Sequence, residues 1–286
     1  LRHCYVIVKL RLDCGLHGHV VGRKYELYDC IVVGAGPAGL SASLFLARYR
    51  HRTLTFHHNS PRNEYAHGVH GFLGHHGISP VELLARGRDE VTAHGGLIVE
   101  GCVTEIEQLP NKHFRVSIGD VDKDRRTFDA QRVLLATGLR DVTPDCPGFR
   151  DFYGVSVHHC PDCDGYECIG KRIAVLGSGR KTVGFSLGLL TWTNKITLIT
   201  EDDVSDDDRA QLAAFDIDVR RQSIKALEGD LESKQLQRVL FDDGDAGFVR
   251  RVIDEDLFGH GGAGRARPSS RRSCAVSNRG KPMILE

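Results

Sequence analysis

The chain has 286 residues, of which 41% are hydrophobic and 27% are charged, with 38 basic and 38 acidic residues. This charge balance argues against long-range attraction to nucleic acid or to an anionic membrane, so partners of both kinds are not expected. The longest apolar stretch, Cys30–Ala47, is interrupted by glycines and a proline, which indicates a strand, a turn and a helix rather than a membrane span.

The first 25 residues contain only short apolar runs, too short for the core of a signal peptide, and are predicted to be an N-terminal extension. The first folded unit follows. Asp29–Gly39 (DCIVVGAGPAG) is a polar residue, a β-branched apolar run and a glycine-rich turn. A helix-like stretch, Leu40–Arg50, and a second apolar run, Thr53–Phe56, come next. This order predicts strand, turn, helix and strand.

The same order returns later in the chain. Arg172–Thr182 (RIAVLGSGRKT) is followed by a helix-like stretch, Val183–Thr193, and an apolar run, Lys195–Ile199. Between the two units, Phe114–Ile118 and Thr127–Leu135 read as strands. Two such units predict an α/β fold with two Rossmann-like dinucleotide-binding domains.

The predicted domains have boundaries set by changes in sequence character. The extension covers 1–25, the first dinucleotide-binding domain 26–145, and the second domain 146–256. Prolines and a glycine near residue 145 mark the linker. The tail, 257–286, is rich in glycine and arginine without an apolar period, and we expect it to be disordered.

The first glycine-rich turn is a full G-x-G-x-x-G. Gly34 permits the sharp turn, Gly36 lets a pyrophosphate approach the backbone, and Gly39 lets the helix pack against the strand. The alternative is that this glycine-rich turn binds no ligand. An acid for the ribose hydroxyls is missing after the second strand, where His57 and His58 stand, although histidine can also hydrogen-bond a hydroxyl. The cofactor-binding residues predicted in this turn are Gly34, Ala35, Gly36, Pro37, Ala38 and Gly39.

The second turn keeps two glycines, and its predicted cofactor-binding residues are Gly177, Ser178 and Gly179. Thr182 stands where a small third residue is usual, so we expect it to crowd the contact between helix and strand. The acids Glu201–Asp203 follow the next strand, and they would repel the 2′-phosphate of NADPH. Binding of NADH is therefore electrostatically easier than binding of NADPH. The alternative is that this unit keeps the fold but binds nucleotide poorly.

A third motif, His158–Glu167 (HHCPDCDGYE), carries the chain's one tight cysteine pair among nine cysteines. One thiolate of such a pair can attack an external disulfide while the other resolves it, and His159 would lower a thiol pKa. The alternative is a zinc site at this pair, with His158 or His159 and Cys168 completing the ligands. Because no second ligand pair is visible, no metal site is predicted. The pattern is typical of a reducing compartment, here the cytoplasm.

Together these residues resemble the low-molecular-weight thioredoxin-reductase family and its thioredoxin-reductase-like flavoprotein relatives. The resemblance runs from about Tyr28 to Asp243. Its most specific pieces are GAGPAG (Gly34–Gly39), PRN (Pro61–Asn63), HGFLGHHGISP (His70–Pro80), LLATGLRD (Leu134–Asp141) and HCPDCDGYE (His159–Glu167).

The resemblance implies FAD on the first domain and NADH or NADPH on the second. Asn63, Thr137 and Gly138 are then further cofactor-binding residues. Cys160 and Cys163 become the redox-active disulfide, with Asp164 as the general acid. Electrons would pass from NAD(P)H through FAD to this disulfide and on to a thioredoxin-like protein or a small-molecule disulfide or dithiol. A homodimer is also expected from the resemblance.

The sequence departs from the family at the C-terminal side. Members close the FAD domain with a segment marked by an AAGD-like sequence, and nothing after Phe258 resembles it. This segment is therefore expected to be missing or degenerate, and FAD to be held weakly. Two alternative functions follow: a thiol oxidase that uses oxygen, and a catalytically degenerate nucleotide-binding or redox-sensing protein.

Overall fold

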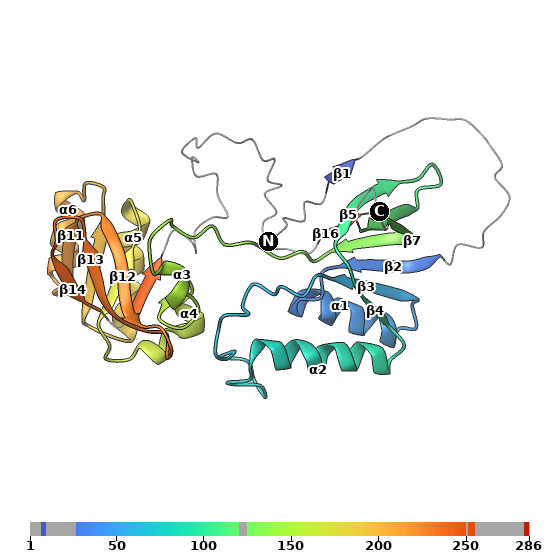
Figure 1. Ribbon diagram of the computed structural model, residues 1–286, viewed down its shortest axis with the longest axis horizontal. Helices are drawn as coiled ribbons and strands as arrows, with labels where there is room; N and C mark the ends of the chain where they lie inside the picture. Colours follow the sequence, from blue (N-terminus) through green and yellow to red (C-terminus); the bar gives the residue numbers. More distant parts are fainter. Residues whose placement is uncertain (1–6, 10–26, 120–124, 250, 255–282, 286) are drawn as a thin grey trace. The chain divides into compact units, whose positions relative to one another are not determined.

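The computed structural model describes residues 7–9, 27–119, 125–249, 251–254 and 283–285, which form two compact units (Figure 1). The described residues of unit 1 come from Leu1–Arg62, Val81–Leu139 and Asn278–Glu286, and those of unit 2 from Asn63–Pro80 and Arg140–Ser277. Both units are α/β structures with parallel strands, as predicted.

Unit 1 is built on an eight-stranded sheet. Its strands run in the order β1 (Ile7–Lys9), β5 (Val103–Gln108), β6 (Phe114–Ile118), β7 (Arg126–Leu135), β2 (Tyr28–Val33), β3 (Thr53–His57) and β4 (Leu97–Glu100), and β16 (Met283–Leu285) also pairs with β7. The strands β7, β2, β3 and β4 are parallel, whereas β5, β6 and β7 are antiparallel. The parallel part is the dinucleotide-binding arrangement that the sequence predicts.

Two helices of unit 1 pack together beside these parallel strands. Helix α1 (Pro37–Arg48) begins at the glycine-rich turn, and α2 (Pro80–Ala93) lies along it in Figure 1. Leu40 of α1 and Leu84 and Val91 of α2 are buried in one cluster, so apolar burial holds the two helices in place. The start of α1 is thereby fixed at the carboxyl end of β2.

Unit 2 contains a five-stranded parallel sheet and a smaller antiparallel one. The parallel sheet has the order β11 (Asp218–Arg221), β10 (Ile196–Thr200), β9 (Ile173–Leu176), β15 (Arg251–Asp254) and β8 (Val157–His158). The antiparallel sheet consists of β12 (Ile224–Asp230), β13 (Gln235–Phe241) and β14 (Ala246–Phe248). Side chains from both sheets meet in one buried cluster, which includes Phe241 and Val252.

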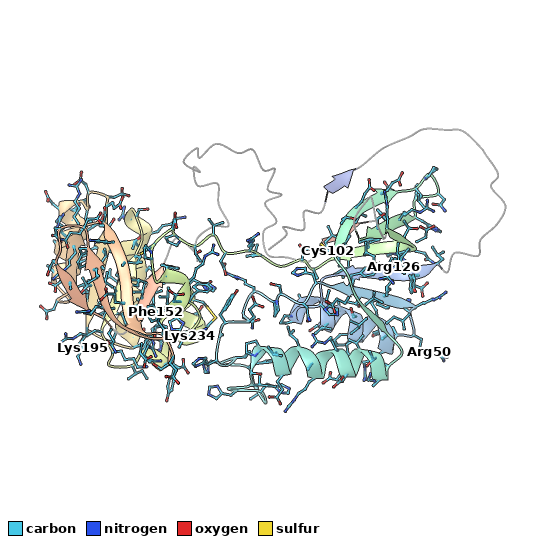
Figure 2. The ribbon with its side chains drawn as sticks, viewed as in Figure 1. Arg50, Cys102, Arg126, Phe152, Lys195 and Lys234 are labelled. Atoms are coloured by element: carbon cyan, nitrogen blue, oxygen red, sulfur yellow. A yellow bond between two sulfur atoms is a disulfide. The ribbon has the colours of Figure 1, made fainter. Side chains whose placement is uncertain are left out.

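Short helices fill the connections of unit 2. Phe152, labelled in Figure 2, is fully buried in the same cluster. No helix within the described part of the chain has the length and apolar character needed to cross a membrane. The helices are α3 (Phe149–Phe152), α4 (Pro161–Asp164), η1 (Tyr166–Cys168), α5 (Arg180–Gly188), η2 (Leu189–Thr191) and α6 (Asp206–Ala213).

The unit boundaries differ from the predicted domains in two segments. Residues 63–80 and 140–145, assigned from sequence to the first domain, group with unit 2. Packing accounts for 63–80: the Tyr65 ring lies edge-on to Tyr153, and the backbone of Gly154 closely approaches Tyr65. In the predicted extension, 7–9 forms β1. Of the predicted disordered tail, 257–286, residues 257–282 and 286 lie outside the described residues, and 283–285 form a strand.

The strand that leads to the cysteine pair is fastened by one buried hydroxyl. Ser156, directly before β8, is fully buried. Its Oγ donates to the Lys234 carbonyl at 2.8 Å and accepts from the Leu236 amide at 3.1 Å and from Arg251 Nη1 at 3.2 Å. The hydroxyl therefore joins β8 to both sheets of unit 2.

We predict that Ser156→Ala lowers the free energy of unfolding by about 1–3 kcal/mol, because buried partners lose a hydrogen bond. Urea denaturation measures the change. Ser60→Ala, at an exposed serine, is the control and should stay within about 0.5 kcal/mol of the unsubstituted chain. Equal stabilities of the two variants would contradict this prediction.

Candidate functional site

The glycine-rich turn of unit 1 is shaped by close backbone contacts. Gly34 has φ +110°, and a Cβ on it would collide with the carbonyl oxygen of Ala136 at the end of β7. A Cβ on Gly39 would collide with the carbonyl oxygen of Gly34. Both positions therefore require glycine, as the G-x-G-x-x-G pattern indicates.

Gly36 differs from Gly34 and Gly39 because it faces open space. A Cβ there would meet nothing within 4 Å, and its φ of −75° is open to any residue. The backbone at Gly36 is thus approachable from outside, which suits a pyrophosphate at the N-terminus of α1. Ala35 is buried, whereas Pro37 and Ala38 are exposed in the first turn of α1.

The predicted flavin-side residues lie in different units. Thr137 and Gly138 are exposed directly after β7, in unit 1, beside the turn that begins at Gly34. Asn63 is exposed as well but groups with unit 2. The structure therefore brings Thr137 and Gly138 together with the turn, whereas Asn63 belongs to the other unit.

The missing ribose acid is replaced by a histidine that could serve a similar purpose. His57 ends β3, and its Nδ1 atom is buried without a hydrogen-bond partner among the described residues. Burial, and then Arg88, lowers the pKa of His57, so the ring is neutral near pH 7. A neutral imidazole can hydrogen-bond a hydroxyl. The turn and this ring together fit an adenine dinucleotide such as FAD.

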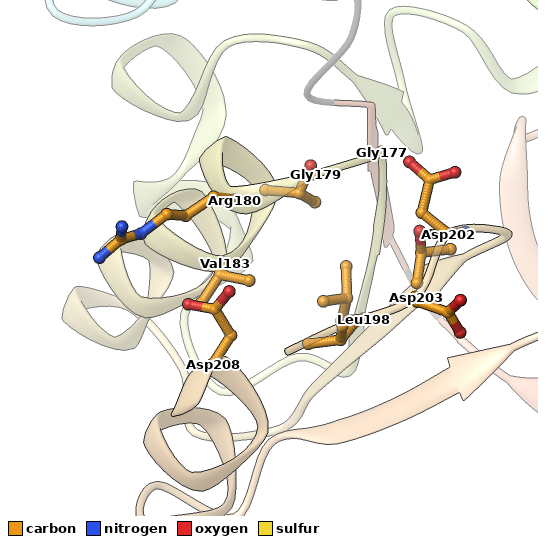
Figure 3. Close-up of a pocket in the computed structure, with 11 residues that line it drawn as sticks. Gly177, Gly179, Arg180, Val183, Leu198, Asp202, Asp203 and Asp208 are labelled. Carbon is orange, nitrogen blue, oxygen red and sulfur yellow. Dashed lines mark hydrogen bonds between the residues drawn. The ribbon is translucent and has the colours of Figure 1, made fainter. Parts of the chain in front are cut away.

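The second turn lies between β9 and α5 in unit 2 and borders a pocket (Figure 3). Gly179 has φ +74° and precedes α5, while Ser178 is exposed. Thr182 is accommodated rather than crowded: its buried Oγ1 donates to the Ser178 carbonyl at 3.1 Å. The residue thus uses its hydroxyl to satisfy a carbonyl of the turn.

The charges around this pocket are mostly acidic. Figure 3 shows Asp202 and Asp203 on one side of the pocket, with Arg180 and Asp208 on the other. Arg221 at the end of β11 is paired with Asp203, Nη1 to Oδ1, at 2.6 Å. The nearby arginine is thus already engaged with a carboxylate.

The cysteine pair forms a disulfide, Cys160–Cys163, as the C-x-x-C spacing predicts. Pro161 begins the short helix α4, and the amides of Cys163 and Asp164 both donate to the Cys160 carbonyl, at 3.3 and 3.2 Å. Cys160 is half-buried and Cys163 is exposed. Cys163 is therefore the member of the pair at the surface, where a sulfur partner can approach.

Other thiols in the described residues are not suited to this chemistry. Burial raises the pKa of Cys30 to about 11, and it also raises the pKa of Cys146 and Cys168. These thiols are free and remain protonated near neutral pH, so they are weak nucleophiles. Cys102 is disulfide-bonded.

Two side-chain contacts involve residues next to the disulfide in the chain. In the first, His158 Nδ1 lies 3.3 Å from Asp164 Oδ2. In the second, the Tyr153 hydroxyl donates to Asp141 Oδ2 at 2.7 Å and lies 3.0 Å from His159 Nδ1. Because the single hydroxyl hydrogen goes to the carboxylate, His159 Nδ1 must be the donor in the second contact. The carboxylate and tyrosine thus fix the tautomer of His159.

The segment 63–80 adds an aromatic and a charged contact beside the same motif. Tyr65 is packed edge-on against Tyr153, whose ring also stacks on His159. His70 Nδ1 lies 3.4 Å from Glu167 Oε1. Within the described residues there is no group of three or more His, Cys, Asp or Glu side chains that could hold a metal ion.

Sequence reasoning missed the roles of Tyr65, Asp141 and Tyr153. Asp141 lies within the LLATGLRD segment, so its motif was visible although its contact was not. Tyr153 and Tyr65 lie outside any motif with an assigned role, and their contact joins residues far apart in the chain. Only the fold reveals that contact.

Comparisons with known proteins agree with this geometry. The family model of pyridine nucleotide-disulphide oxidoreductases matches residues 28–245. The chain is 32% identical to thioredoxin reductase tcpT of Claviceps purpurea over 157 residues, which cover 54% of this chain and 48% of the relative. It is 29% identical to the thioredoxin reductase of Treponema pallidum, covering 81% of this chain and 75% of the relative.

Solved structures agree as well. An oxidoreductase from Agrobacterium tumefaciens superposes with a TM-score of 0.72 at 31% identity, covering 80% of this chain and 75% of that one. The matched region is only part of some relatives: it spans 42% of the length of a relative from Arthroderma benhamiae and 48% of the Claviceps protein.

We predict that Gly39→Ala lowers the free energy of unfolding by about 1–3 kcal/mol, because its Cβ would overlap the Gly34 carbonyl oxygen. Gly36→Ala, in the same turn, is the matched control and should change stability by less than about 0.5 kcal/mol. Thermal and urea unfolding of both variants measure the difference. A destabilised Gly36→Ala would show that the turn is tighter than described.

Proposed function

Because the chain belongs to the pyridine nucleotide-disulphide oxidoreductase family and is thioredoxin-reductase-like, we propose that it transfers electrons from NAD(P)H to the Cys160–Cys163 disulfide and on to a disulfide substrate. One observation carries the proposal. A disulfide with one exposed cysteine, Cys163, lies in the same unit as a nucleotide-type turn, while three other thiols have raised pKa values.

The turn of unit 1 would hold FAD through the open backbone at Gly36 and the N-terminus of α1, with His57 toward the ribose. Thr137 and Gly138, exposed beside that turn, would contact the cofactor as well. When bound, FAD would supply the step between two-electron hydride donors and thiol–disulfide exchange. The second turn, at Gly177 and Gly179, would take the nicotinamide nucleotide.

A residue of the chain itself would donate the proton that disulfide reduction requires. Reduction breaks the S–S bond, and one sulfur must then be protonated or remain a thiolate. Asp164, one residue after Cys163, is the general acid that we propose for this proton. Its side chain is 23% exposed, so solvent can return a proton to it.

The exposed position of Cys163 favours a substrate that can bring its disulfide to an open surface, where the thiolate of the reduced pair attacks one substrate sulfur. A thioredoxin-like protein or a small-molecule disulfide meets this condition. Attack by the second cysteine then re-forms the Cys160–Cys163 disulfide and releases the reduced substrate.

We predict that the full chain, supplied with FAD, oxidises NADH in the presence of an aromatic disulfide such as 5,5′-dithiobis(2-nitrobenzoate). Cys160→Ser and Cys163→Ser should abolish turnover, and Asp164→Asn should lower kcat by about 10²–10⁴. Absorbance at the NADH and thiol bands measures both half-reactions.

Cys146→Ser is the matched control and should retain turnover, because burial keeps that thiol protonated. Turnover that survives Cys160→Ser would overturn the proposed disulfide. Oxygen consumption with a dithiol, in place of NADH oxidation, would support the thiol-oxidase alternative instead.

We also predict that NADH is preferred over NADPH, because Asp202 and Asp203 border the pocket and would repel a 2′-phosphate. Asp203→Asn should narrow the preference by releasing Arg221 for the phosphate. Asp245→Asn, which breaks the similar exposed pair with Arg220, is the control and should leave the preference unchanged. Titration of both nucleotides at matched ionic strength tests this, and tighter NADPH binding by the unsubstituted chain would contradict it.

A further inference from the structure

His158 is placed by the sheet rather than by the loop that carries the cysteines. It is the last residue of β8, its backbone is paired with Ile253 of β15, and it is only 7% exposed. The strand itself is fastened by Ser156, two residues earlier. The imidazole therefore has a rigid base directly before the redox turn.

The partner of His158 lies on the far side of that turn. Asp164 ends α4, and its amide donates to the Cys160 carbonyl at 3.2 Å. His158 Nδ1 is 3.3 Å from Asp164 Oδ2, so the pair closes the segment around Cys160 and Cys163.

We propose that His158 is a positioning residue that acts through Asp164. Its imidazole holds the carboxyl group beside the redox turn and stabilises the carboxylate that remains after a proton is given up. The inference rests on the proposed function only in giving Asp164 a part in the thiol chemistry. His158 itself need not touch a sulfur.

The step balances with any two-electron thiol reductant. The reductant breaks the Cys160–Cys163 bond and becomes a disulfide, and two electrons go to the two sulfurs. One sulfur takes the proton of Asp164, the other remains a thiolate, and the two protons of the reductant's thiols pass to solvent. The reduced turn then carries two negative charges, the Asp164 carboxylate and the thiolate. The contact with His158 offsets their repulsion.

Other charged groups near the turn are already engaged or exposed. Glu167 is beside His70, and Asp141 accepts from Tyr153. Asp162 is exposed in α4 and therefore screened by water. His158 is the buried group that contacts the Asp164 carboxyl directly.

The test is the reduction potential of the disulfide in the full-length chain, without nicotinamide or flavin. Protein is equilibrated in mixtures of reduced and oxidised dithiothreitol at pH 7, and its free thiols are counted by alkylation. His158→Leu should shift the equilibrium toward the disulfide by about tenfold, which is ~30 mV for a two-electron couple. His158→Asn keeps a donor near the position of Nδ1 and should recover part of this shift. His113→Gln, at a surface turn of unit 1, should match the unsubstituted chain.

Asp164→Asn separates positioning from simple packing. This variant should shift the equilibrium toward the dithiol, and in its background His158→Leu should change the equilibrium by less than twofold. A full tenfold shift in that background, or an unchanged potential in folded His158→Leu, would overturn the proposal. If His158→Leu does not fold, an unchanged potential in His158→Asn overturns it equally. If the reduction potentials change as expected but the chain does not oxidise NADH, this inference holds and the proposed function fails.

Discussion

The parallel pairing of β8, β15, β9 and β10 is the constraint on which the site of unit 2 depends. Parallel strands end at the same edge of a sheet, so whatever follows each strand gathers there. The disulfide follows β8, the glycine-rich turn follows β9, and the acids of the pocket follow β10. Three motifs separated in sequence therefore share one edge without any long loop to bring them together.

The same rule organises unit 1, and there it explains which glycines the sequence needs. The turn after β2 and the segment after β7 leave neighbouring strands at one edge, so the backbones of Gly34 and Ala136 are in contact. That contact leaves no room for a Cβ. Gly36, which faces outward, is free of this requirement, so its glycine is explained by an approaching ligand rather than by the fold.

Much of this could be predicted from sequence because it is local. The strands around Asp29–Val33 and Ile173–Leu176, the turns after them and the disulfide all follow from periodicity and spacing. The association of residues 63–80 with unit 2 could not be predicted, because it depends on ring contacts between Tyr65 and Tyr153. The expected crowding at Thr182 did not allow for its hydroxyl, which bonds the Ser178 carbonyl. In both cases the outcome depends on contacts within the folded chain that a local sequence pattern does not specify.

The environments of the cysteines show how one chain can hold both inert and reactive thiols. Cys30 and Cys168 are buried in strand and helix cores, where desolvation disfavours a thiolate. Cys160 and Cys163 instead lie at a sheet edge, where water and polar side chains are within reach. A reactive dithiol thus needs a rigid base and a polar surface together. The buried hydroxyl of Ser156 and strand β8, which it holds, supply the rigid base. The side chains of His158 and Asp164 supply the polar surroundings.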